Sequence, residues 1–229
     1  MNITQRFNDQ KRQTTADEVF IGLYSDIISI RLKPGTKLSE AEISKQLGVS
    51  RQPVREAFMR LGELGLLLIR PQKATLVPKI SLEALKTTRF IRAAIEVEVV
   101  RKACQVATKE SLDALEENLR KQKAAMGDKD TFSLRDLDYE FHRLICVSAD
   151  CLSAFKIISE NKAHTERVCS LELADEASMI EVFEGHSNIV KAIIERDEEA
   201  AVKQTRLHLA HLDKTLQSAG KNHPDYFED

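Results

Sequence analysis

The feature that most limits how this chain can fold is the long stretch between Pro78 and Pro224, which contains no proline. Apolar residues recur there at intervals of three and four, which is the spacing of one helix face. One helix is predicted to begin at Ser81, and a second, which carries Leu112, is predicted to end at Gly127. Four more are predicted at Thr131 to Ser148, Asp150 to Leu171, Ser178 to Glu195, and Asp197 to Gly220. Six antiparallel helices of this kind form a bundle, whose interior is the natural place for a ligand pocket.

Residues 47–57 predict the turn and second helix of a helix-turn-helix. Gly48 can end one short helix in the left-handed conformation, and Ser50 can cap the next. An apolar stripe then packs that helix inward, formed by Val54, Ala57, Phe58, Leu61 and Leu64. Three polar side chains are left facing outward: Arg51, Gln52 and Arg55. An exposed helix with such side chains in its first turns can contact base edges and phosphates in a DNA major groove.

The segments on either side of this motif predict a winged form of it. The spacing in Thr15–Glu18 is that of a capping box and predicts a helix to about Arg31. A second box at Ser39–Glu42 predicts a short helix whose Ile43 and Leu47 pack inward. Residues 66–69 and 76–77 predict two short strands around a polar tip, with Lys73 and Thr75 able to meet phosphate or the minor groove. The alternative is a helical hairpin whose surface arginines are merely solvated.

Charge is divided unevenly along the chain. A net charge of −2 alone argues against a simple basic nucleic-acid-binding protein. Residues 1–79, however, carry 13 Lys and Arg against 8 Asp and Glu, a net charge of +5, and the remainder carries 21 against 28, a net charge of −7. We therefore expect a mostly α protein in which a winged helix-turn-helix DNA-binding domain (1–79) precedes an all-α antiparallel bundle (80–229) that binds metal and effector and dimerises.

Other features of the sequence indicate the cellular compartment. No apolar run approaches the roughly 20 residues that a membrane span needs, and the first residues lack the apolar core of a signal peptide. We expect a cytoplasmic protein with no membrane partner. The cysteines show no CxxC spacing and lie in helical patterns, which favours reduced, mostly buried thiols over disulfides or zinc ligands: Cys104, Cys146, Cys151 and Cys169.

Four polar groups interrupt the apolar faces of the predicted bundle. Asp138 and His142 have the i, i+4 spacing that aims both side chains at one point. His186 and His208 lie 11 residues before and after Asp197, so in a helical hairpin both stand about 16 Å from the turn. Three imidazoles and one carboxylate suit a divalent transition metal with an open position, zinc first and nickel or manganese as alternatives. The competing interpretation is that each is a core residue satisfied by a neighbour.

The run PGTKLSEAEISKQLGVSRQPVREAFMRLGELGLLLIRPQKATLV resembles the DNA-binding domain of the GntR family of bacterial transcription regulators. The resemblance implies that Arg51 and Arg55 make the principal operator contacts. It implies assistance from Ser50, Gln52 and the wing residues Lys73 and Thr75. Two positions depart from the usual pattern, since Ile30 and Ala74 stand where glycine is common. If the wing tip needs a positive φ, Ala74 adopts it at a cost of roughly 1 kcal/mol or the wing is reshaped.

The segments LDYEFH, EGHSNIVKAIIERDEEAA and TRLHL are similar to the FCD ligand-binding domain of the FadR-like branch of that family. That resemblance implies a metal held by the group Asp138, His142, His186 and His208, and an organic-acid effector whose carboxylate reaches the metal. It also implies that Arg92 lines the effector pocket; from the residues alone, an ion pair with a core glutamate such as Glu96 is the alternative. Ser148-Ala149-Asp150 stands where these domains usually have Gly-Asn.

Together these patterns predict a ligand-responsive transcription regulator, not an enzyme. It would bind double-stranded operator DNA as a homodimer, since two half-sites multiply affinity and specificity, under control of a small carboxylate at the metal site. One alternative is a DNA-binding domain fused to a metal-dependent, hydrolase-like helical domain, for which Glu96 is the only candidate base. A second alternative is a dimerisation module with a structural metal.

Overall fold

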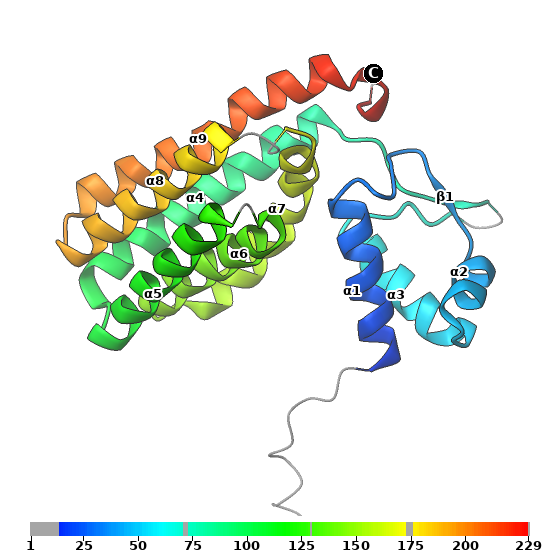
Figure 1. The fold of residues 1–229 in the computed structure, drawn as a ribbon, viewed down its shortest axis with the longest axis horizontal. Coiled ribbons are helices and arrows are strands. Elements are labelled where there is room, and N and C mark those ends of the chain that lie inside the picture. The colour runs from blue at the N-terminus through cyan, green and yellow to red at the C-terminus, as the bar shows by residue number, and fades with distance from the viewer. Residues whose placement is uncertain (1–13, 71–72, 129, 173–175, 229) are drawn as a thin grey trace, which may run out of the picture. The chain divides into compact units, whose positions relative to one another are not determined.

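The computed structural model describes residues 14–70, 73–128, 130–172 and 176–228, and the chain divides into two compact units between Lys79 and Ile80. The first unit contains α1 (Thr15–Ile28), β1 (Lys37–Leu38), α2 (Glu40–Leu47), α3 (Arg51–Glu63) and β2 (Thr75–Leu76) (Figure 1). The second contains α4 (Leu82–Val106), α5 (Lys109–Gly127), α6 (Thr131–Ser148), α7 (Leu152–Glu172), α8 (Glu176–Ile194), α9 (Glu198–Asn222) and the 3-10 turn η2 (Pro224–Tyr226). The predicted fold class, a winged helix-turn-helix followed by an all-α bundle, is confirmed.

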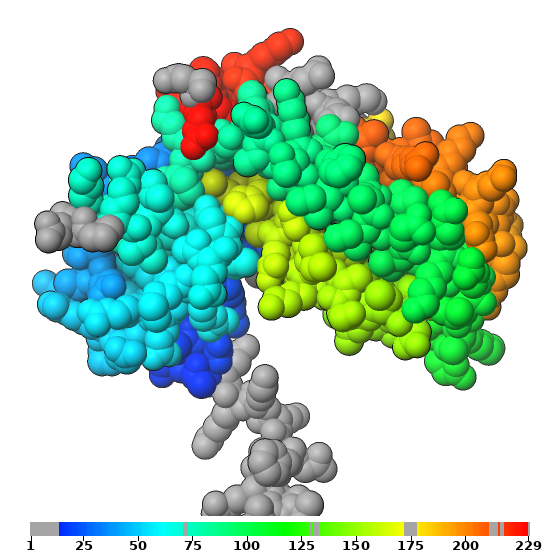
Figure 2. All heavy atoms as spheres, turned by 180° about the vertical axis from the view of Figure 1, so that it is seen from behind, coloured from blue at the N-terminus to red at the C-terminus, as the bar shows by residue number. Residues whose placement is uncertain are grey.

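Helix α3 is the centre of the first unit. Its predicted apolar stripe is buried at Val54, Ala57, Phe58 and Leu61, and it packs against α1. Gly48 joins α2 to α3 with φ 67°, the left-handed conformation that the turn requires. Figure 2 shows α3 (light blue to cyan) at the surface of this unit, as a recognition helix must be.

The wing differs from the prediction. Residues 66–69 do not form a strand: Leu66 and Leu67 turn into the core, and only Leu68 exchanges backbone hydrogen bonds with Leu76. The partner of β2 is instead β1, which pairs with it in antiparallel register and was not predicted. A two-residue strand next to a Pro-Gly turn is too short to give a periodic signal.

Several predicted details of α1, α2 and α3 are wrong. Thr14, not Thr15, forms the capping box with Asp17. Ser39 and Ser50 occupy N-cap positions, yet their side chains accept no cap hydrogen bond. Leu47 does not pack inward but is 52% exposed, because α2 is a short surface helix with no fully buried residue.

The two departures from glycine behave differently. Ile30 takes φ 60° after the end of α1, which for a β-branched side chain costs roughly 1–2 kcal/mol. Ala74 does not take a positive φ. Ala74 therefore carries no left-handed backbone strain.

The second unit is a bundle in which α4 and α9 lie side by side, as do α5 and α6, and α8 and α9 (Figure 1). Side chains of α4 and α5 (green) and α7 (yellow-green) close over one of its faces (Figure 2). Its core contains residues of all six helices α4 to α9, among them Val100, Leu115, Phe141, Ile158, Ile193 and Ala201. Ser81 and Asp197 cap α4 and α9 as predicted, whereas α8 begins at Glu176, two residues before the predicted Ser178.

The end of the described chain folds back on the start of this unit. Ile80 forms a parallel bridge with Phe227, and its N–H donates to the carbonyl of Tyr226 over 2.8 Å. Phe227 and Ile80 share a small apolar cluster with Leu85 of α4 and Ala219 of α9. The sequence prediction ended at Gly220 and missed this contact.

Two simpler expectations concern membranes and thiols. Among the described residues, no helix has the length and apolar character needed to cross a bilayer. The four cysteines are free thiols; Cys104 and Cys146 are buried, and Cys151 and Cys169 are half-buried.

Arg196 connects the α8–α9 turn to the end of α4. It lies in the turn between α8 and α9, and its guanidinium donates to the carbonyls of Ala103, Cys104 and Ala107 at the end of α4, over 3.3, 2.9 and 2.6 Å. Arg196→Ala should lower the free energy of unfolding by about 1–3 kcal/mol, because helix-end acceptors lose charged donors. Urea unfolding measures this, with the exposed Arg206→Ala of α9 as control. Equal stability of the two variants would contradict the capping role.

Candidate functional site

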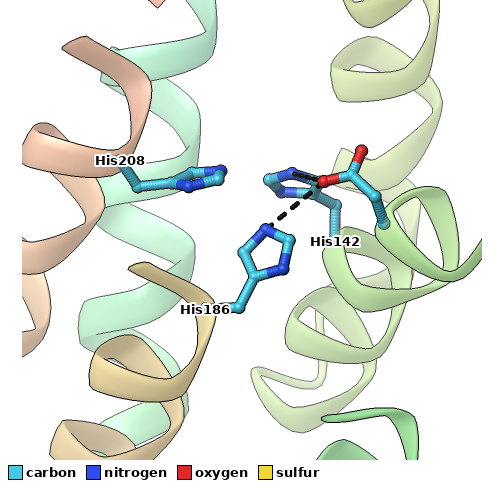
Figure 3. Close-up of side chains that lie close together, drawn as sticks. His142, His186 and His208 are labelled. Atoms are coloured by element: carbon cyan, nitrogen blue, oxygen red, sulfur yellow. Dashed lines mark ion pairs between the residues drawn. The ribbon is translucent and has the colours of Figure 1, made fainter. Parts of the chain in front are cut away.

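The four polar groups singled out in the bundle converge in the structure. Asp138 and His142 come from α6, His186 from α8 and His208 from α9, and one potential ligand atom of each lies within 4.8 Å of the others. Figure 3 shows the three imidazole rings pointing toward one another. The His186 and His208 ring centroids are 4.6 Å apart, so these residues stand at the same height on the α8–α9 hairpin.

A glycine makes room for one of these rings. His208 lies against Gly185, and a Cβ on that glycine would come within 3.1 Å of His208 Nδ1. Gly185 is inside α8, where glycine is unfavourable by about 1 kcal/mol relative to alanine. Its presence is explained by the space that the imidazole needs.

Hydrogen bonds on the outer side of the rings fix their orientation. His142 Nδ1 lies 2.8 Å from Glu96 Oε2, and His186 Nδ1 lies 2.9 Å from Gln122 Oε1. The opposite nitrogen of His186, Nε2, is buried without a hydrogen bond, although Asp138 Oδ1 is 3.3 Å away. A core histidine satisfied by its neighbours would not leave that nitrogen open, whereas a metal ligand oriented by outer acceptors would.

Asp138 offers only one of its oxygens to the cluster. Lys162 of α7 donates to the other oxygen, Oδ2, and to Glu166 Oε1 over 2.7 Å. Burial alone would raise the pKa of Asp138, but Lys162 and the imidazoles hold that pKa well below its usual value. Oδ1 is left facing His142 and His186, at 3.8 and 3.3 Å.

The protonation states suit metal binding. Burial lowers the pKa of His186, and burial together with the other imidazoles lowers the pKa of His208 well below its usual value. Asp138 is therefore a carboxylate and these two imidazoles are neutral, which are the forms that bind metal ions. Ligand atoms around one tetrahedral zinc ion lie roughly 3.4 Å apart, so side chains whose ligand atoms now lie within 4.8 Å of one another would draw together on binding it.

A cavity of about 320 Å³ adjoins the cluster and is bounded by three of its members, Asp138, His142 and His208. Its other walls combine apolar side chains, among them Leu134, Val182 and Phe183, with polar and charged ones. This volume is at the lower end of the roughly 300–1,000 Å³ of small-molecule sites. The space suits a small molecule.

Arg92 also lines this cavity. Its Nε lies 2.7 Å from Glu96 Oε1, and both residues are 6% exposed. Burial would raise the pKa of Glu96, but Arg92 and His142 bring it well below its usual value. The ion pair kept open as the alternative for Arg92 is therefore present, on a residue that also faces the cavity.

Sequence reasoning missed three residues of this site: Gln122, Lys162 and Glu166. Gln122 follows Leu115 and Asn118 on the buried face of α5, so a polar residue on an apolar stripe was the available signal. Lys162 and Glu166 form an i, i+4 pair. Such a pair has the same appearance on a solvated helix face, so the sequence held no signal for their burial.

The predicted DNA-contacting residues lie at the start of α3 and in the wing. Ser50, Arg51, Gln52 and Arg55 are exposed in the first turns of α3. Arg55 pairs with Glu40 of α2 over 3.2 Å, and Gln52 donates to Glu56. Within the part of the chain that the structure describes, Arg51 makes no hydrogen bond or ion pair. On the wing, Lys73 is exposed and Thr75 is half-buried in β2.

Comparison with known proteins identifies this architecture. Residues 15–77 match the bacterial regulatory proteins of the gntR family, and residues 88–211 match the FCD domain. The chain belongs to the GntR family of regulators and carries an FCD domain. It is 34% identical to the HTH-type transcriptional repressor RspR of Escherichia coli K12, over 100% of this chain and 97% of that protein.

Other GntR relatives support the same assignment. A probable D-xylose utilization operon transcriptional repressor of Paenarthrobacter nicotinovorans is 31% identical over 91% of this chain and 92% of its own length. The structure of E. coli McbR/YncC has the same fold, with a TM-score of 0.77 at 23% identity, over 90% of this chain and 98% of that one. The protein is a ligand-responsive transcription regulator. GntR regulators bind DNA and typically act as dimers, and FCD domains often bind metal.

The space at Gly185 yields a prediction about the cluster. Gly185→Ala should weaken zinc binding by about tenfold or more, because the added Cβ displaces the His208 ring while all four candidate ligands remain. Competition with a zinc chelator measures the affinity. Gly22→Ala in α1 is the matched control, since its Cβ would meet nothing within 4 Å. Unchanged zinc affinity in Gly185→Ala would show that His208 does not bind the ion.

Proposed function

We propose that this protein is a metal-dependent repressor that binds operator DNA as a homodimer and is controlled by a small organic acid bound in the FCD domain. The observation that carries the proposal is the buried, open Nε2 of His186 beside Asp138 Oδ1, at the wall of a cavity of about 320 Å³. The names of two relatives, both repressors, favour repression over activation.

The proposed ion is held by Asp138 Oδ1 and by imidazole nitrogens of His142, His186 and His208. Zinc fits this donor set first, with nickel or manganese as alternatives. A bound ion supplies a positive charge with an open position that an effector carboxylate can reach. Glu96 and Gln122 orient the rings, Lys162 neutralises part of the carboxylate charge, and the remaining N–H groups of Arg92 are available to the effector.

On the DNA side, Arg51 and Arg55 are the proposed readers of the operator, assisted by Ser50, Gln52 and the wing residues Lys73 and Thr75. The exposed position of Arg51 without a partner among the described residues supports this role. Arg55 would exchange Glu40 for DNA, which costs little because exposed ion pairs contribute only about 0–1 kcal/mol.

Among the described residues, the two carboxylates considered as a base for the enzyme alternative are already engaged. Glu96, the candidate from the sequence, is occupied by Arg92 and His142, and its lowered pKa makes it a weak proton acceptor. Glu166 is likewise held by Lys162. These contacts favour a binding site over a catalytic one.

Helix α9 offers a route from this site toward the DNA-binding unit. It carries His208 near its middle, and the segment that follows it pairs with Ile80, the first residue of the second unit. A change in α9 on effector binding would therefore reach the connection between the units. Reciprocal coupling requires that operator DNA alter effector affinity by the same factor.

Arg51 tests the DNA half of the proposal. Arg51→Ala should weaken specific operator binding by about tenfold or more, because a base or phosphate contact worth roughly 1–3 kcal/mol is lost. A gel-shift titration at fixed salt measures this. Arg31→Ala, which removes an exposed arginine paired with Asp26 outside α3, is the control. Equal operator affinity of Arg51→Ala and the unchanged protein would refute the assigned recognition helix.

Metal removal tests the sensing half. Zinc-loaded protein should show a higher melting temperature with small carboxylic acids, and chelation of the zinc should abolish that shift, because a ligand that binds only the native state stabilises it. Elemental analysis and thermal shift are the measurements. His186→Ala should lose both the zinc and the response. An acid-induced shift that survives chelation would separate acid binding from the metal.

A further inference from the structure

Three cationic side chains line the cavity: Arg92, Arg135 and Lys162. Two of them are already neutralised, since Arg92 pairs with Glu96 and Lys162 pairs with two carboxylates. Arg135 differs. Its only contact within the described residues is a hydrogen bond from Nη2 to the Ser170 hydroxyl over 3.4 Å, so no described carboxylate compensates its charge.

Arg135 and the metal cluster occupy different levels of the cavity. On α6, Arg135 precedes Asp138 by three residues, which is about 4.5 Å along the helix axis. On α7, Ser170 follows Lys162 by eight residues, or about 12 Å along the axis. Lys162 of α7 binds Asp138 of α6, and Ser170 of α7 binds Arg135 of α6. These two α6–α7 contacts therefore lie at different heights along the wall that the two helices form.

Several of the side chains that line the cavity together with Arg135 are apolar. Leu134 precedes it on α6, and Met179, Val182 and Phe183 of α8 line the same cavity. A half-buried guanidinium in such a cavity loses part of its hydration, and no carboxylate among the described residues compensates it, which is unfavourable until an anion arrives. Guanidinium is also the cation best suited to bind a carboxylate or phosphate through two parallel hydrogen bonds.

We infer that the effector carries two anionic groups, one directed to the metal cluster and the other bound by Arg135 with Ser170. Arg135 is thus a specificity-determining residue that selects diacids, or acids bearing a phosphate, over monoacids of the same length. This inference rests on the proposed function, because it takes the cavity as the effector site.

The test compares acids that differ only in the second charge. Zinc-loaded full-length protein is titrated calorimetrically with succinate, glutarate and adipate, and with butyrate, valerate and hexanoate. At least one diacid should bind about tenfold or more tightly than its matched monoacid, because a hydrogen bond to a charged group contributes that much. Arg135→Gln should remove this preference by weakening the diacid alone, and Arg135→Lys should keep part of it.

Controls separate this inference from the proposal beneath it. Arg120→Gln, which alters an exposed arginine on α5 paired with Glu117, should change neither affinity. Zinc content should stay constant in all variants. If monoacids and diacids bind alike, or if Arg135→Gln weakens both equally, the role of Arg135 is refuted while the effector site stands. If the zinc-loaded protein binds none of these acids, both proposals fail.

Discussion

The bundle depends on how it accommodates one half-buried carboxylate, that of Asp138. Asp138 of α6 accepts from Lys162 of α7 through one oxygen and faces the imidazoles of His142 and His186 through the other. A carboxylate left uncompensated in this interior would cost several kcal/mol, so the lysine is needed before any ion arrives. Because lysine and cluster use different oxygens, the site can be assembled in the folded chain and still keep one oxygen for a metal. The chain can therefore fold around Asp138 without needing the ion to compensate its charge.

The sequence predicted those parts of the site that helix geometry alone determines. Asp138 and His142 share a face because they are four residues apart, and the α8–α9 turn near Asp197 brings His186 level with His208. Gln122 and Lys162 were missed because they reach the cluster from helices whose neighbours only the tertiary structure determines. The same limit explains the errors at Leu47 and in the wing, where burial and strand pairing depend on residues distant in sequence.

Two of the departures from the family pattern fall where the backbone takes a positive φ. Ile30 stands at a common glycine position and still takes φ 60°, and Asp150, after Ser148-Ala149, takes φ 48°. Aspartate tolerates the left-handed region far better than a β-branched residue does. The chain therefore keeps both turns without glycine, at a small cost in one case and a larger cost in the other.

The cation at Arg135 gives this pocket a character that the metal cluster alone would not. A metal ion selects any carboxylate, so discrimination between acids has to come from the remaining walls, where one apolar group more or less changes affinity only modestly. A charged group without a counter-ion discriminates more strongly, because a ligand that fails to match it leaves a desolvated charge behind. The other two cations of the cavity, Arg92 and Lys162, are already paired. On this proposal Arg135 therefore both binds the second anionic group of the effector and determines which acids the regulator recognises.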